Sequence, residues 1–125
     1  MYDLATDKTS IELIREFWEA EKVVAAVCHG PAALVNVKLS DGKYLVADAA
    51  VTGFSNDEED SIGLSQFMPF MLETELQKIS GGKYEKASKL WGEHVVVSKN
   101  GRLITGQNPY SAVAIGQALA RAVAP

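Results

Sequence analysis

Hydrophobic residues recur at two different spacings near the start of the chain, and each spacing predicts one kind of element. Between Asp7 and Lys22 they return every three or four positions, which is typical of a helix with one apolar face. Val23–Val27 contains no polar residue, which predicts a strand buried on both faces, as in a parallel sheet covered by helices. These two segments predict an α/β protein. The expected apolar face consists of Ile11, Leu13, Ile14, Phe17 and Trp18, with Thr9 or Ser10 as the helix cap.

The middle of the chain predicts a mixture of helices and short strands. A short helix begins at Gly30 or Pro31 and ends near Val37, and a turn at Ser40–Lys43 follows it. Tyr44–Phe54 is expected to contain one or two short strands. A longer helical segment is then predicted from Asn56 to Ile79, with an interruption at Pro69.

The last third of the chain predicts a hairpin and a helix. His94–Ser98 and Arg102–Thr105 are rich in β-branched residues, and Asn100-Gly101 lies between them, which is a strong hairpin pattern. Asn108 is expected to cap a final helix that has Pro109 at its first position and runs to Val123.

Composition and charge narrow the classes of function. A chain of 125 residues with 47% hydrophobic and 22% charged residues is expected to form one globular domain. The net charge of −4 excludes a basic nucleic-acid surface, and no apolar run reaches the roughly 20 residues that span a bilayer. The first residues lack the pattern of a secretory signal, and one cysteine excludes an intrachain disulfide, so we expect a reducing, cytoplasmic location.

The single cysteine, Cys28, lies where the predicted strand turns into the next helix. Most lone cysteines are inert core residues. Here, however, the thiol is followed by His29 and by a Gly-Pro helix start, at the strand end where open α/β sheets bind their ligands. Backbone N–H groups at a helix N-terminus favour a thiolate. The pattern therefore predicts a reactive thiol of low pKa.

Other polar residues have simpler interpretations. The acidic run Asn56–Asp60 opens a predicted helix, where carboxylates complement the helix dipole. His94 stands beside Trp91 at a strand start and is expected to be structural. With two histidines, one cysteine and no ligand-like spacing, we predict no metal site.

The predicted sheet is too small for the strand that precedes Cys28. A strand buried on both faces needs parallel neighbours, and the segments after residue 40 provide few of them. We therefore expect this chain to be the C-terminal half of a larger domain, whose remaining strands and catalytic wall lie in sequence that it does not contain.

Four blocks of sequence resemble one known family. They are Ala25–Pro31, Val51–Glu59, His94–Val97 and Leu103–Pro109. In this order they resemble the ThiJ/PfpI superfamily, also called the DJ-one superfamily, and most closely its chaperone-like, glutathione-independent glyoxalase III branch. The resemblance implies a flavodoxin-like (class I glutamine amidotransferase-like) α/β sandwich, of which residues 1–125 form the C-terminal part.

The resemblance also implies a reaction and a set of site residues. Methylglyoxal would be converted to D-lactate without a cofactor, with Cys28 as nucleophile, His29 as proton carrier and Glu59 as the acid that orients it. Counting along the motif favours Glu59, with Glu58 as second choice. In the family, a glutamate and a Gly-rich loop of the N-terminal half complete the site, and neither occurs here. The family also implies a possible homodimer.

Three alternatives accompany the glyoxalase prediction. A Cys-His pair also serves peptidases and amidases, although a histidine directly after the cysteine makes their geometry harder to reach. A low-pKa thiol could act as a stress-linked redox sensor, and the Phe67–Met71 stretch could bind client proteins as a chaperone surface, although such residues are more often core. The third alternative is an inactive fragment.

Overall fold

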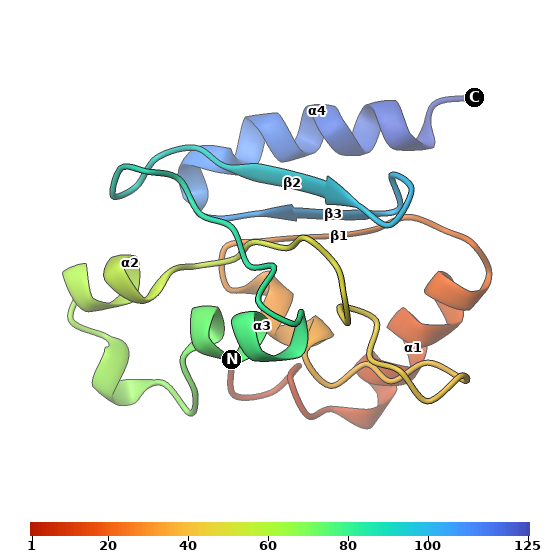
Figure 1. Cartoon of the computed structure of the whole chain (residues 1–125), viewed down its shortest axis with the longest axis horizontal. Coiled ribbons are helices and arrows are strands. Elements are labelled where there is room, and N and C mark those ends of the chain that lie inside the picture. The colour runs from red at the N-terminus through yellow and green to blue at the C-terminus, as the bar shows by residue number, and fades with distance from the viewer.

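Three strands form the sheet of the computed structural model, which describes residues 1–125. Strand β1 (Val24–Val27) lies parallel to the central strand β3 (Leu103–Gly106), and β2 (Val95–Ser98) lies antiparallel on the other side of β3 (Figure 1). Every residue of β3 is buried. The α/β class is therefore confirmed, and β1 forms one edge of the sheet.

The hairpin between β2 and β3 forms as predicted. Lys99, Asn100 and Gly101 all have positive φ angles, of 50°, 58° and 84°. Asn and Gly tolerate this left-handed region, which hairpin turns require. The Asn-Gly pair thus fixes the connection that brings the central strand into the sheet.

Helices cover both faces of the sheet. Helix α4 (Ala112–Val123) packs on one face, where Ile104, Ile115 and Ala118 form a small apolar cluster (Figure 1). Helix α1 (Lys8–Glu19) and the 3₁₀ helix η1 (Gly30–Leu34) lie on the other face, over the larger core. None of the helices combines the length and the apolar character needed to cross a bilayer.

Two expectations about α1 are wrong. Asp7, rather than Thr9 or Ser10, caps the helix, because its carboxylate accepts a hydrogen bond from the Ser10 backbone N–H at 2.8 Å. On the expected apolar face Trp18 is buried, but Leu13 and Phe17 remain 53% and 50% exposed. Both side chains line an open apolar groove between α1 and β1.

The middle segments also differ from the expectation. Between Tyr44 and Phe54 there is no strand, only isolated bridges, and the Thr52 N–H bonds instead to the Thr105 side chain at 3.0 Å. The expected helix after residue 55 is divided by Pro69, as predicted, but into three pieces rather than two. They are α2 (Asn56–Ser61), the 3₁₀ helix η2 (Ser65–Phe67) and α3 (Leu72–Ile79).

Strand β1 is not buried as its composition predicts. Ala25 is exposed, because β1 has a partner on one side only. The prediction of two-sided burial is therefore wrong for the isolated chain.

The helix after Cys28 is a single 3₁₀ segment, which ends at Leu34 rather than near Val37.

Candidate functional site

Cys28 occupies a sharp turn at the carboxyl end of β1. Its φ angle is 64°, a left-handed conformation that non-glycine residues rarely adopt. Two neighbouring segments hold it there, because its N–H donates to the Gly106 carbonyl at 3.0 Å and its carbonyl accepts from the Phe54 N–H at 2.8 Å. The backbone geometry is that of a strand-to-helix elbow, which presents the thiol above the sheet.

The three predicted site residues form one line of successive contacts. Cys28 Sγ is 3.6 Å from His29 Nδ1, and His29 Nε2 is 2.6 Å from Glu59 Oε2. A carboxylate can only accept, so the imidazole carries its proton on Nε2 when neutral, and Nδ1 offers a lone pair to the thiol. The arrangement permits proton transfer from the thiol to the imidazole.

Helix α2 decides which of two adjacent carboxylates reaches His29. Ser55 accepts from the Glu58 N–H, and the Glu58 side chain accepts in turn from the Ser55 N–H, which forms a capping box. This bond directs Glu58 away from the imidazole and leaves Glu59 beside it. Both carboxylates lie in the first turn of α2, as the dipole interpretation predicts, but both are also buried.

The expectation of a low-pKa thiol is also wrong. Burial raises the pKa of Cys28, and the negative charges of Glu58 and Glu59 raise it further, although the His29 backbone N–H acts in the opposite direction. The 3₁₀ helix that follows has only five residues, so its dipole is small. Cys28 therefore depends on a base to become a nucleophile.

Aromatic rings form a wall beside the histidine that the sequence analysis did not identify. The Phe54 ring lies 4.3 Å from that of His29, centre to centre, and Trp91 meets Phe54 edge-on at 5.5 Å. Tyr110 continues the row at 6.2 Å from Trp91 and is exposed. The row leads from the imidazole to the surface and gives the site one apolar side.

Gln107 and Asn108 are two further residues that the sequence analysis did not assign to the site. Their side chains donate to Glu58 at 3.0 and 2.7 Å. Asn108 occupies the N-cap position before the 3₁₀ helix η3 (Pro109–Ser111), as predicted, but its side chain makes no capping bond to that helix. Both residues follow the carboxyl end of β3, the edge of the sheet at which Cys28 stands, and this position could have identified them.

The remaining candidates lie apart from this line of residues. His94 Nε2 lies 3.4 Å from Glu85 Oε1, and the backbone N–H of His94 donates to the Ser111 hydroxyl. No group of three or more potential ligands is close enough to hold a metal ion.

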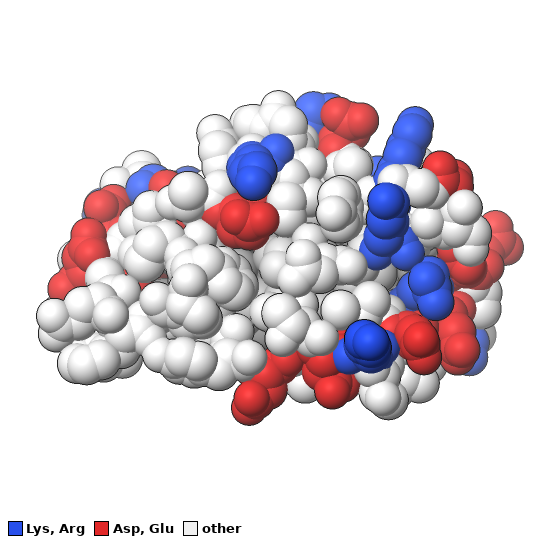
Figure 2. Space-filling view, turned by 90° about the horizontal axis from the view of Figure 1, so that it is seen from below, with Lys and Arg blue, Asp and Glu red and all other residues white.

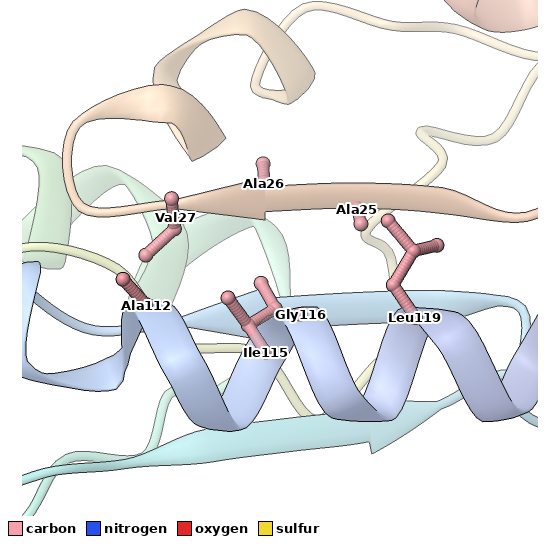
Figure 3. Close-up of a pocket in the computed structure, with 7 residues that line it drawn as sticks. All are labelled: Ala25, Ala26, Val27, Ala112, Ile115, Gly116 and Leu119. Atoms are coloured by element: carbon pink, nitrogen blue, oxygen red, sulfur yellow. The ribbon is translucent and has the colours of Figure 1, made fainter.

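Two apolar grooves flank the open edge of β1. One, of about 210 Å³, lies between β1 and α4, where Leu119 and Ile115 face Ala25 and Val27 (Figure 3). The other, of about 250 Å³, lies between β1 and α1 and includes Phe17. No titratable group lines either groove, in contrast to the site at the carboxyl end of β1.

Known proteins resemble the chain over most of its length. It is 29% identical to glyoxalase 3 of Candida albicans over 117 residues, which are 90% of the chain and 49% of the relative. It is 29% identical to the glutathione-independent glyoxalase HSP31 of Saccharomyces cerevisiae, over 90% of the chain and 48% of that protein. The probable glutathione-independent glyoxalase hsp3103 of Schizosaccharomyces pombe is 32% identical, at 97% and 48% coverage. The chain spans about half the length of these relatives.

Solved structures match in the same proportion. The 24 kDa Rapid Encystment Protein of Francisella tularensis superposes with a TM-score of 0.90 at 35% identity, over 99% of this chain and 53% of that one. Glyoxalase III from Candida albicans gives a TM-score of 0.83 at 27% identity, over 97% and 52%. No family model matches the chain. The comparisons therefore confirm the resemblance that the four sequence blocks predict, to about half of a glutathione-independent glyoxalase of the ThiJ/PfpI superfamily, and the fold is a partial flavodoxin-like α/β sandwich.

Proposed function

We propose that this chain carries the thiol, base and acid of a glutathione-independent glyoxalase that converts methylglyoxal to D-lactate. The observation that carries the proposal is the line from Cys28 through His29 to Glu59, with contacts of 3.6 and 2.6 Å. The names of the relatives, which are glutathione-independent glyoxalases, support the same reaction.

The first step of the proposed reaction is addition of the thiol to the aldehyde. His29 Nδ1 takes the proton of Cys28, and the sulfur attacks the aldehyde carbon, so that a C–S bond forms as the C=O bond becomes an alkoxide. The alkoxide takes a proton to give a hemithioacetal. Glu59 stabilises the imidazolium that exists in between, as the carboxylate of a catalytic triad does.

The second step is an internal redox change that needs no cofactor. A base removes the hydrogen from the former aldehyde carbon to give an enediol, and the neighbouring carbon, the former ketone, takes a proton. The first carbon is thereby oxidised to a thioester and the second is reduced to an alcohol. Water then cleaves the thioester, which releases lactate and restores the thiol. The whole reaction adds one molecule of water to methylglyoxal.

A reducing compartment suits this proposal. The nucleophile has to remain a free thiol, and Cys28 has no disulfide partner in the chain. We therefore propose the cytoplasm as the site of the reaction.

The decisive test is formation of D-lactate from methylglyoxal, without glutathione, by the chain and by Cys28→Ala, with circular dichroism recorded for both. Turnover that requires Cys28 is the expected result. If both folded proteins fail to produce lactate, or produce it equally, the proposal is wrong for this chain.

A chaperone-like surface is a second candidate, because one stretch of apolar side chains is exposed. Ile62, Leu64 and Phe67 are 45%, 40% and 57% exposed, and the end of the molecule that carries η2 presents a broad uncharged surface (Figure 2). Phe70, by contrast, packs against the core. Binding of the dye ANS that is lost in Phe67→Ser would support this candidate. Equal dye binding by the variant would exclude Phe67 from such a surface.

A further inference from the structure

Glu58 is a buried carboxylate without a cationic partner. It is fully buried, and none of the ion pairs of the molecule includes it. Its partners are three neutral donors: the Ser55 N–H at 2.9 Å and Gln107 Nε2 at 3.0 Å on Oε1, and Asn108 Nδ2 at 2.7 Å on Oε2. Burying a charge without a counter-ion costs free energy. The segments that the three hydrogen bonds of Glu58 hold in place therefore indicate its role.

The two amides connect Glu58 to the segment before β2. Gln107 Oε1 accepts from the Ala87 N–H at 2.8 Å, and Asn108 Nδ2 donates a second bond to the Gly92 carbonyl at 2.6 Å. Asn108 Oδ1 accepts from Ser111, whose hydroxyl accepts from the His94 N–H. Residues 87–94, which form no helix or strand, are thus attached at three points that lead back to one carboxylate.

Trp91 lies in the middle of this attached segment. Its φ angle is 63°, so its backbone is held in a conformation that a free loop would seldom populate. Its ring meets Phe54 edge-on, and Phe54 contacts His29. Trp91 is thus connected to the imidazole through one intervening ring, that of Phe54.

We propose that Glu58 is a positioning residue, which ties the Trp91 segment to helix α2 and so holds the aromatic wall and the Glu59 side of the site in one arrangement. Glu58 does not touch the reacting atoms in this account. The proposal concerns the geometry of the site and does not depend on the reaction that the site performs.

The chemistry of the donors explains why a carboxylate is needed. Gln107 and Asn108 each use their amide oxygen for another partner, so each presents its NH₂ group to Glu58. A carboxylate accepts at both oxygens. In Glu58→Gln the remaining oxygen would serve the two donors now on Oε1, and the new NH₂ group would face the Asn108 NH₂ group. The bond to Asn108 is therefore the one expected to break.

The experiment is fluorine NMR of the protein labelled with 5-fluorotryptophan. The chain has two tryptophans, Trp18 and Trp91, so two resonances are expected. In Glu58→Gln we expect the Trp91 resonance to shift and broaden, while that of Trp18, which lies on α1 and is buried, stays in place. Glu12→Gln is the matched control, because it makes the same substitution at an exposed position. Its two resonances are expected to match those of the wild type.

Three outcomes would overturn the proposal. They are an unchanged Trp91 resonance in folded Glu58→Gln, an equal change of both tryptophans, and a change in the Glu12→Gln control. Should Glu58→Gln fail to fold, Asn108→Ala decides, because it releases Gly92 and leaves Glu58 bonded to Ser55 and Gln107. A Trp91 resonance that stays in place in folded Asn108→Ala contradicts the proposal in the same way.

Discussion

Strand β1 meets two very different surroundings, one at its end and one along its side. At its carboxyl end, Cys28 enters a site in which His29 and Glu59 are hydrogen-bonded and Glu58 has three donors. Along its side, the exposed Ala25 lies between two apolar grooves. The site is thus organised within these 125 residues, whereas the edge of the sheet leaves apolar surface in contact with water.

The contrast separates two kinds of information in a sequence. The hydrogen bonds from His29 to Glu59 and from Gln107 and Asn108 to Glu58 join segments that this chain contains, so they form when the chain folds. The apolar sequence of β1 is typical of a strand that is covered on both faces, and no element of this chain covers Ala25. Changes at the site should therefore affect chemistry, and changes at the edge should affect association.

The largest expected effect is on the chemistry of the site. Glu59→Gln should slow the reaction of Cys28 with methylglyoxal on the order of 10²-fold or more, because a neutral amide stabilises the imidazolium poorly. Mass spectrometry of the Cys28 adduct over time measures this rate. The matched control is Glu85→Gln, which removes the carboxylate beside the other histidine, His94. Equal rates of adduct formation in the two variants would show that Glu59 does not assist the reaction of Cys28.

The next effect is on stability, at the centre of the sheet. Ile104 on β3 is fully buried and packs against Ile115 of α4. Its replacement by alanine should lower the free energy of unfolding by about 2–5 kcal/mol, since it removes buried methyl groups and leaves a cavity. Urea denaturation followed by circular dichroism measures the change. A loss below about 1 kcal/mol would mean that α4 does not pack on β3 as described.

A substitution at the open edge of β1 should change association rather than stability. Ala25→Lys is expected to change the free energy of unfolding by no more than about 0.5 kcal/mol, because the position is exposed. It should, however, reduce self-association, since a charge on an edge strand opposes pairing with another strand. Sedimentation velocity at several concentrations compares the two proteins. The possible homodimer stays a prediction until then, and a wild-type chain that is monomeric at every concentration would contradict it.

A smaller effect concerns the pH dependence of the thiol. Burial and the charges of Glu58 and Glu59 raise the pKa of Cys28, so its thiolate should form at higher pH than that of an ordinary cysteine. The rate of alkylation by iodoacetamide, which requires the thiolate, should therefore rise with a midpoint above that of a free cysteine. A midpoint below it would restore the low-pKa thiol and with it the redox-sensor alternative.

Local patterns in the sequence predicted the elements that depend on neighbouring residues. The elbow at Cys28 and the Asn100-Gly101 hairpin follow from residues within a few positions of each other, and both form. Family resemblance, rather than spacing, identified Glu59, and the structure brings it to 2.6 Å from His29. Its catalytic role stays a prediction.

Features that depend on distant segments could not be read from local patterns. The pKa of Cys28 rises chiefly because folding buries the thiol, and further because two carboxylates thirty or so positions away lie near it. Thr52 bonds to a side chain of β3 and so lies along the sheet without forming a strand. The exposure of Phe17 depends on which element covers it, and a helical pattern alone does not contain that information.

The central claim is that Glu59 fixes the proton of His29 on Nε2 and leaves Nδ1 as the base for Cys28. Nitrogen-15 NMR of the imidazole at neutral pH tests it most directly. The account predicts a protonated Nε2, with a downfield proton resonance from its bond to Glu59, and an unprotonated Nδ1. A neutral imidazole that carries its proton on Nδ1 would contradict the account, because it could not accept the proton of the thiol.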